Sequence, residues 1–200
     1  SACVCLPGYS GNGKICTPIN LCKKGNGGCY IFAKCTMTGP GKRNCTCAVD
    51  QIGDGIKCKS KLHQEIRKKG LMDFSYSLQR SDIYYLQGRG PFTVFAPNNN
   101  AFHKLGNEQM VNKEKNIAIL LYHIVPCRSL LPEELQQPRN LTTLTGEILT
   151  ISYSGGTIQI NNNSKVVYSD QESSNGIFYE IDTVLFPPSY QKMEETGTKD

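Results

Sequence analysis

Residues 22–58 decide the fold of the first part of the chain, and they read CKKGNGGCYIFAKCTMTGPGKRNCTCAVDQIGDGIKC. The six cysteines of this stretch have the spacing C-x6-C-x5-C-x9-C-x-C-x10-C. The last three recur upstream, because residues 3–16 also read C-x-C-x10-C, at an offset of 42 residues. Both copies carry a turn sequence, Gly-Asn-Gly or Gly-Asp-Gly, before the final cysteine. A repeat with a fixed period indicates small modules in tandem.

Ten cysteines occur in the 200 residues, and nine of them precede residue 59. A module this small cannot bury enough apolar surface to fold on its core alone, so it needs crosslinks, and disulfides persist in oxidising compartments. The sequence therefore predicts an extracellular protein. Structural zinc usually takes paired C-x2–4-C ligands, which this spacing lacks, so we predict no metal site. Three sequons mark candidate glycosylation sites at Asn44, Asn140 and Asn162.

Charge is distributed unevenly along the chain. Residues 1–70 hold 12 Lys/Arg and 3 Asp/Glu, whereas residues 71–200 hold 10 and 14. A basic half is either a solvated surface or a surface that attracts anionic lipid, glycosaminoglycan or an acidic partner. Nucleic acid is not expected as a partner of an extracellular chain. The candidate residues for an anionic ligand are Lys23, Lys24, Lys34, Lys42 and Arg43.

The second half has a different composition and predicts an α+β domain, with helices first and strands later. Helical spacing of apolar residues over 62–78 is interrupted near Gly70, and further helices are expected over 98–105 and 113–123. Strands are expected over 92–95, 148–151, 157–160, 165–168 and 177–181. No apolar run approaches the roughly 18–20 residues that a membrane-spanning helix needs.

The six-cysteine spacing resembles that of the epidermal-growth-factor-like (EGF-like) module. The resemblance implies the disulfides Cys22–Cys35, Cys29–Cys45 and Cys47–Cys58, and the same rule pairs Cys5 with Cys16 in the preceding unit. Two cysteines remain, Cys3 and Cys127, which either pair with each other or leave Cys127 as a buried free thiol.

Many modules of this family bind calcium through acidic residues just before the first cysteine. Pro18 and Leu21 stand at those positions here, and only Asn20 could offer an oxygen ligand. We therefore expect no calcium in this module.

Three stretches of the second half resemble the signatures of the fasciclin domain, in the same order. They are residues 90–102 (GPFTVFAPNNNAF), 121–125 (LYHIV) and 175–185 (NGIFYEIDTVL). The resemblance implies a wedge-shaped β-sandwich with helices packed around it. The expected domains are the end of a truncated EGF-like module (1–17), a complete EGF-like module (18–59), a fasciclin domain (60–189) and a polar tail or cloning remnant (190–200).

EGF-like units placed directly before a fasciclin domain resemble the stabilins, a family of endothelial and macrophage scavenger receptors. The resemblance implies the extracellular region of a type I plasma-membrane receptor, with roles in adhesion, endocytosis and the clearance of anionic ligands or phosphatidylserine-exposing cells. The hyaluronan-binding link module of that family is not visible. The alternative is that these modules are spacers with no ligand of their own.

Related matrix proteins contact integrins through a Tyr-His motif flanked by Leu and Ile, and Tyr122 and His123 match it. Asp170, on an expected loop, is the candidate carboxylate of a second motif. The alternative for Tyr122 and His123 is that both are core residues whose polar tips bond locally.

We predict no enzymatic activity and no cofactor. The three histidines, His63, His103 and His123, lie in no recognisable catalytic motif. The carboxylate pair Glu133-Glu134 follows Pro132, which is typical of a helix start rather than of an acid/base pair.

Overall fold

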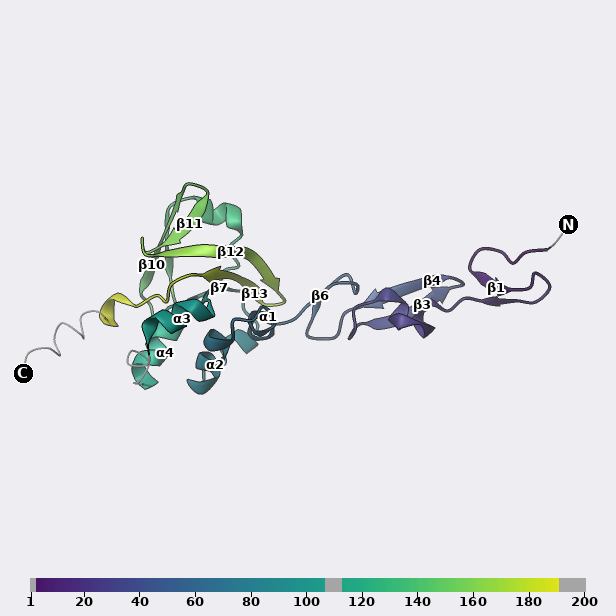
Figure 1. Cartoon of the computed structure of the whole chain (residues 1–200), viewed down its shortest axis with the longest axis horizontal. Coiled ribbons are helices and arrows are strands. Elements are labelled where there is room, and N and C mark those ends of the chain that lie inside the picture. The colour runs from purple at the N-terminus through teal and green to yellow at the C-terminus, as the bar shows by residue number, and fades with distance from the viewer. Residues whose placement is uncertain (1–2, 107–112, 191–200) are drawn as a thin grey trace, which may run out of the picture. The chain divides into compact units, whose positions relative to one another are not determined.

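The computed structural model describes residues 3–106 and 113–190. The chain divides into two compact units, Ser1–Ser60 and Lys61–Asp200. The first unit is built from short hairpins and the second from a large sheet with helices (Figure 1). The second unit is thus of the α+β class, as the sequence predicts.

Within its described residues, 3–60, the first unit contains three two-stranded sheets and two short 3-10 helices. The sheets pair β1 with β2, β3 with β4, and β5 with β6. The bounds are β1 Tyr9–Gly11, β2 Cys16–Pro18, η1 Leu21–Lys23, η2 Gly25–Gly28, β3 Lys34–Gly39, β4 Lys42–Thr46, β5 Ile52–Gly53 and β6 Cys58–Lys59.

The two Gly-x-Gly turns have the same structure, which explains why the sequence repeats them. In the first turn the Asn12 side-chain oxygen accepts from two backbone N–H groups, and in the second turn Asp54 does the same. Gly13 and Gly55 follow with φ near +85° and +82°. A Cβ on either residue would collide with the backbone of Cys3 or Cys45, so only glycine fits.

All four implied disulfides are present. They join Cys5 to Cys16, Cys22 to Cys35, Cys29 to Cys45 and Cys47 to Cys58.

The expectations for the remaining two cysteines are wrong. Cys3 and Cys127 are both free and exposed, so they do not pair, and Cys127 is not a core thiol. Cys127 directly follows the edge strand β8 with a left-handed φ of 63°, in a turn that leaves the core.

Seven strands of the second unit form one continuous sheet in the order β8-β7-β13-β12-β11-β10-β9. Their bounds are β7 Phe92–Pro97, β8 Ile124–Pro126, β9 Arg139–Thr142, β10 Ile148–Ser154, β11 Thr157–Ile160, β12 Ser164–Ser173 and β13 Gly176–Ile181. The two edges approach each other, because Leu144 N–H, just beyond β9, donates to Ile124 O on β8 at 2.9 Å. The sheet is therefore curved into a nearly closed barrel.

Helices cover part of the sheet's outer face (Figure 1). Their bounds are α1 Leu62–Lys68, α2 Met72–Arg80, η3 Tyr85–Gln87, α3 Asn99–Leu105, α4 Lys113–Leu121 and η4 Pro132–Gln136. The predicted break near Gly70 is confirmed, since Gly70 has φ +90° and separates α1 from α2. The predicted cap is also present: Asn98 Oδ1 accepts from Ala101 N–H at 2.9 Å.

Two hydrophobic cores lie on opposite faces of the sheet. On β7, Phe95 faces the core inside the curved sheet, while Val94 and Ala96 face the core under the helices. On β13, Tyr179 likewise faces the core inside the curved sheet, and Phe178 faces the core under the helices. Because both faces are covered, these strands read as nearly continuous apolar runs. β7 and β13 are parallel neighbours, so two of the three fasciclin-like stretches lie side by side.

Asn175 connects three elements of the second unit. Its side-chain oxygen accepts from Leu62 N–H at 2.8 Å, at the start of α1. Its amide nitrogen donates to Leu86 O and Gly88 O, both at 2.9 Å, around η3. The residue is buried in the turn between β12 and β13, so one side chain fixes α1 and η3 against the sheet.

We expect Asn175→Ala to lower the free energy of unfolding of the second unit by about 2 kcal/mol, because buried backbone groups lose their partners. Urea denaturation would measure the change. The matched control is Asn163→Ala, at an exposed position that makes only a backbone bond and keeps the sequon intact. Equal stability of the two variants would contradict this role for Asn175.

Candidate functional site

Tyr122 lies just beyond the end of α4 and is fully buried, with 0% exposure. Its hydroxyl donates to Ile148 O at 2.7 Å and accepts from the Asn161 amide at 2.9 Å. Burial raises the pKa of this phenol. Asn161 in turn accepts from Thr150 N–H, so the tyrosine tip ties the end of α4 to the hairpin of β10 and β11.

His123 is also fully buried, with 0% exposure, and its hydrogen bonds define its tautomer. Leu185 N–H donates to Nε2 at 2.9 Å, so Nε2 carries the lone pair. The proton is therefore on Nδ1, which donates to Ile119 O at 2.7 Å. Burial lowers the pKa of His123 from 6.5 to about 4, so the ring is neutral at physiological pH.

The positions of these two side chains favour the core interpretation over direct contact with an integrin. Both polar tips point inward and have local partners, so neither Tyr122 nor His123 is available to a partner on the surface. The loop expected around Asp170 is a strand: the residue belongs to β12, between irregular register points at Tyr168 and Gln171. Its side chain lies outside the described residues.

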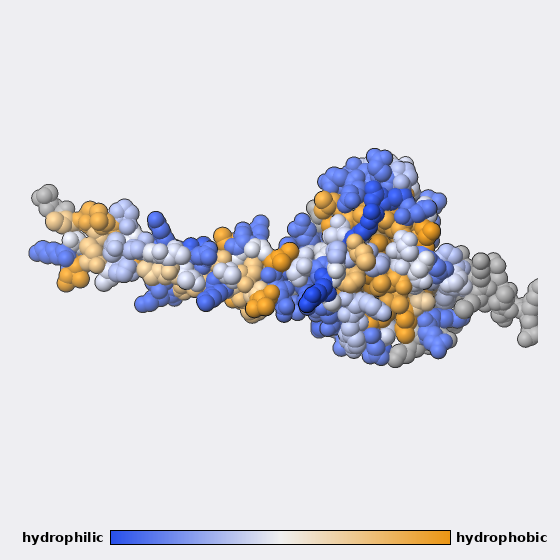
Figure 2. Space-filling model, turned by 180° about the vertical axis from the view of Figure 1, so that it is seen from behind, coloured by the Kyte–Doolittle hydropathy of each residue, from blue (hydrophilic) through white to orange (hydrophobic). Residues whose placement is uncertain are grey.

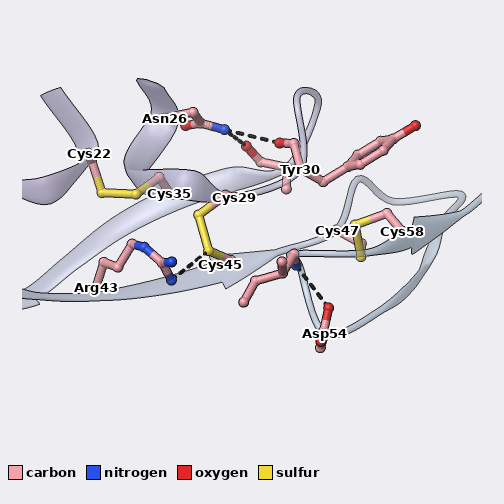
Figure 3. Close-up of a disulfide and its surroundings, with 12 residues drawn as sticks. Cys22, Asn26, Cys29, Tyr30, Cys35, Arg43, Cys45, Cys47, Asp54 and Cys58 are labelled. Carbon is pink, nitrogen blue, oxygen red and sulfur yellow. Dashed lines mark hydrogen bonds between the residues drawn. A yellow bond between two sulfur atoms is a disulfide. The ribbon is translucent and has the colours of Figure 1, made fainter. Parts of the chain in front are cut away.

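The basic residues of the EGF-like module divide between two faces of the β3–β4 hairpin. Cys35 and Cys45 are cross-strand partners on one face, and Arg43 shares it two residues before Cys45. Arg43 Nη1 lies 3.2 Å from Cys45 Sγ (Figure 3), and its stem packs against Gly27. Lys34 and Lys42 are exposed and lie on the opposite strand face.

Lys23 and Lys24 are both exposed. The disulfide Cys22–Cys35 holds η1, which contains Lys23, to the cysteine face of the hairpin. The five candidate cations therefore do not all belong to one face of the hairpin.

The sequence analysis missed an exposed apolar pair near Lys34. Ile31 and Phe32 are 75% and 70% exposed, and only Ala33 separates Phe32 from Lys34 in the chain. Their turn is held from within, because the Asn26 amide donates to Tyr30 O at 3.1 Å and to Ala33 O at 2.9 Å (Figure 3). Figure 2 shows apolar residues at several places on the surface of this unit. The sequence could have indicated this pair, because a module that has almost no core cannot bury two adjacent bulky apolar residues.

The remaining predicted sites have local structural roles or stay predictions. Asn20 Oδ1 accepts from Cys22 N–H at 3.0 Å and caps η1. The predicted helix start at Pro132 is confirmed, since Glu134 accepts from Leu131 N–H in the first turn of η4. Glycosylation stays a prediction. All three sequon asparagines are exposed: Asn44, Asn140 and Asn162.

His103 is 74% exposed and lies 3.4 Å from Asp73. Within residues 3–106 and 113–190, no three His, Cys, Asp or Glu side chains are grouped as metal ligands would be. In the same described ranges, no helix has the length and apolar character required to cross a bilayer.

A disulfide-crosslinked module followed by a domain with a curved seven-stranded sheet defines a modular protein of the kind found in oxidising compartments. Residues 69–187 match the family model of the fasciclin domain, and residues 22–58 match that of the EGF domain. The chain belongs to the fasciclin domain family.

Similar proteins include modular proteins much longer than this chain. Mouse stabilin-1 is 36% identical over 142 residues, covering 70% of this chain and 6% of stabilin-1. Mouse stabilin-2 is 42% identical over 131 residues, covering 64% of this chain and 5% of stabilin-2. Human periostin is 33% identical over 134 residues, covering 64% of this chain and 16% of periostin. The chain therefore spans only a small part of the length of these relatives.

A solved structure supports the fold. The fasciclin domain pair of the insect cell adhesion molecule fasciclin I superposes with a TM-score of 0.54 at 16% identity, covering 78% of this chain and 64% of that one.

Proposed function

We propose that this chain is an extracellular adhesion and ligand-binding fragment of an endocytic scavenger receptor of the type I plasma-membrane class. The proposal rests on the order of its modules, an EGF-like unit directly before a fasciclin domain, and on the similarity to stabilin-1 and stabilin-2. Its role is binding rather than catalysis. Cell-surface proteins such as integrins are proposed partners through exposed surfaces, and not through the buried Tyr122 and His123.

The EGF-like module is the part proposed to bind anionic surfaces, including membranes that expose phosphatidylserine. The observation that carries this proposal is the exposed Ile31–Phe32 turn beside Lys34. Residues 1–60 hold eight Lys/Arg and two Asp/Glu, so the surrounding field is positive.

The energies involved are sufficient for weak binding. Each cation near an anionic bilayer contributes about 1 kcal/mol, and this contribution is screened by salt. Burying a large apolar side chain contributes about 1.5–3 kcal/mol, which salt does not screen. Because Asn26 already fixes the turn, little conformational entropy is lost on binding. Tandem modules would add avidity.

We expect the fragment to sediment with vesicles containing phosphatidylserine and not with pure phosphatidylcholine vesicles. The double variant Ile31→Ser, Phe32→Ser should weaken binding by about tenfold or more, since two buried apolar side chains are lost. Lys34→Gln should weaken it less and reduce its salt dependence.

The control is Val49→Ser, because Val49 is 102% exposed in the same module and is not in this turn. Equal losses for the control and the double variant would exclude the turn as the contact. If neither vesicles nor integrin-bearing cells bind the fragment, the spacer alternative is correct.

A further inference from the structure

A cavity of about 340 Å³ lies in the second unit, between α1, α2 and η3. Its apolar lining includes the exposed ring of Tyr84 and four aliphatic side chains that are themselves buried: Ile66, Leu78, Ile83 and Leu86. Its volume is at the lower end of the range for small-ligand sites, so it can hold one amino-acid residue with part of its backbone.

The walls of the cavity are fixed by hydrogen bonds in the free protein. Asn175 holds both the start of α1 and the backbone of η3. Lys61 Nζ donates to Gln87 O at 2.9 Å, and Ile83 N–H donates to Leu78 O at 2.9 Å. A preformed cavity loses little entropy when a ligand binds.

The polar groups of the cavity select the chemistry of the ligand. Arg67 is the one side chain with a full charge among the described lining residues, and no carboxylate lines the cavity. Gln64, Gln79 and Gln87 add amide groups, which can donate to and accept from a peptide backbone.

His63 adds a buried ring nitrogen to the wall of the cavity. Its Nδ1 is enclosed and has no hydrogen-bond partner, and burial lowers the pKa of the ring. The imidazole is therefore neutral at physiological pH and adds no second charge to the cavity.

We propose that this cavity binds the C-terminal residue of a peptide whose last side chain is apolar. The terminal carboxylate pairs with Arg67, the apolar side chain lies on the aliphatic lining, and the peptide amide bonds to the glutamine side chains. The proposal concerns a different unit from the anionic-surface site and does not depend on that site.

The test is titration of the whole 200-residue chain, labelled with ¹⁵N, with two probes. One is the tripeptide Ac-Ala-Ala-Leu with a free C-terminus, and the other is the same peptide with an amidated C-terminus. We expect saturable shifts of amides in α1, α2 and η3 for the acid, and at least tenfold weaker binding of the amide. Octanoate, which has a carboxylate but no N–H, should also bind more weakly than the acid peptide.

The variant Arg67→Gln should weaken binding of the acid peptide by about tenfold or more, because a charge-assisted hydrogen bond is lost. The control is Arg80→Gln, on an exposed arginine of α2 that does not line the cavity. Both residues are on the surface, so both variants should fold, which their spectra verify. No binding of the acid, equal binding of acid and amide, tighter binding of octanoate, or unchanged affinity in Arg67→Gln would each overturn the proposal.

Discussion

The double substitution Cys29→Ala, Cys45→Ala is expected to unfold the EGF-like module while the second unit stays folded. In the described part of residues 1–60, the buried apolar residues are only Ala33, Cys45 and Cys58, so there is no core to replace the crosslink. Removing a native disulfide from a small extracellular domain typically lowers stability by about 2–5 kcal/mol. That loss is comparable with the whole stability of a module this size.

This disulfide also has neighbours that depend on it. Arg43 contacts Cys45 Sγ, and the Gly55 turn packs against the backbone of Cys45. Tyr30 N–H donates to Gly55 O, so loss of Cys45 would reach the Ile31–Phe32 turn as well. Vesicle binding, if it occurs through that turn, should be lost together with the module's structure.

Limited proteolysis and amide spectra would measure the effect, with cleavage expected within residues 22–58 and none in the second unit. The control is Cys127→Ala, because Cys127 is free and exposed. A double-cysteine variant that resists protease as well as this control would show that the remaining disulfides are sufficient.

The parts of the fold that were predictable are those with a strict local signature. The cysteine spacing resembles that of the EGF-like module, and the disulfides that this resemblance implies are present. The helix break at Gly70 and the cap at Asn98 depend only on neighbouring residues. Strands β8 and β9 were not predicted, because β8 has only three residues and β9 contains a single apolar residue, Leu141, so neither shows an alternation of apolar and polar side chains.

The site was less predictable, because burial depends on contacts between distant residues. Tyr122 bonds to Ile148, 26 positions later, and His123 bonds to Leu185, 62 positions later. No local pattern reveals that these tips point inward. The same holds for the candidate cations, whose placement follows from the register of β3 with β4 and from the disulfide to η1.

Replacing His123 is the second change for which a large effect is expected. His123→Leu places an apolar side chain in the core but leaves Leu185 N–H and Ile119 O without partners there. Unpaired buried groups cost about 1–3 kcal/mol each, so we expect a loss of about 3 kcal/mol. His123→Gln, which has one acceptor and one donor group, should lose less.

The pH dependence of stability provides an independent measure of His123. Its folded pKa of about 4 lies below the ordinary value of 6.5, so the unfolded chain binds more protons between these values. The stability that the neutral ring contributes is therefore fully present above pH 6.5 and is lost as the pH falls toward 4. The expected loss is about 3 kcal/mol, since one pKa unit corresponds to about 1.4 kcal/mol.

Urea denaturation at pH 7.5 and pH 4.5 of the native chain, His123→Gln and His103→Gln would test this. The native chain and His103→Gln should lose stability together, because His103 lies on the surface with 74% of its side chain exposed. His123→Gln should retain about 2–3 kcal/mol that the native chain loses, since glutamine does not titrate. His63 also has a pKa lowered by burial, so a smaller dependence should remain in His123→Gln. The same pH dependence in all three proteins would mean that folding does not lower the pKa of His123, which would contradict its role as acceptor from Leu185 N–H.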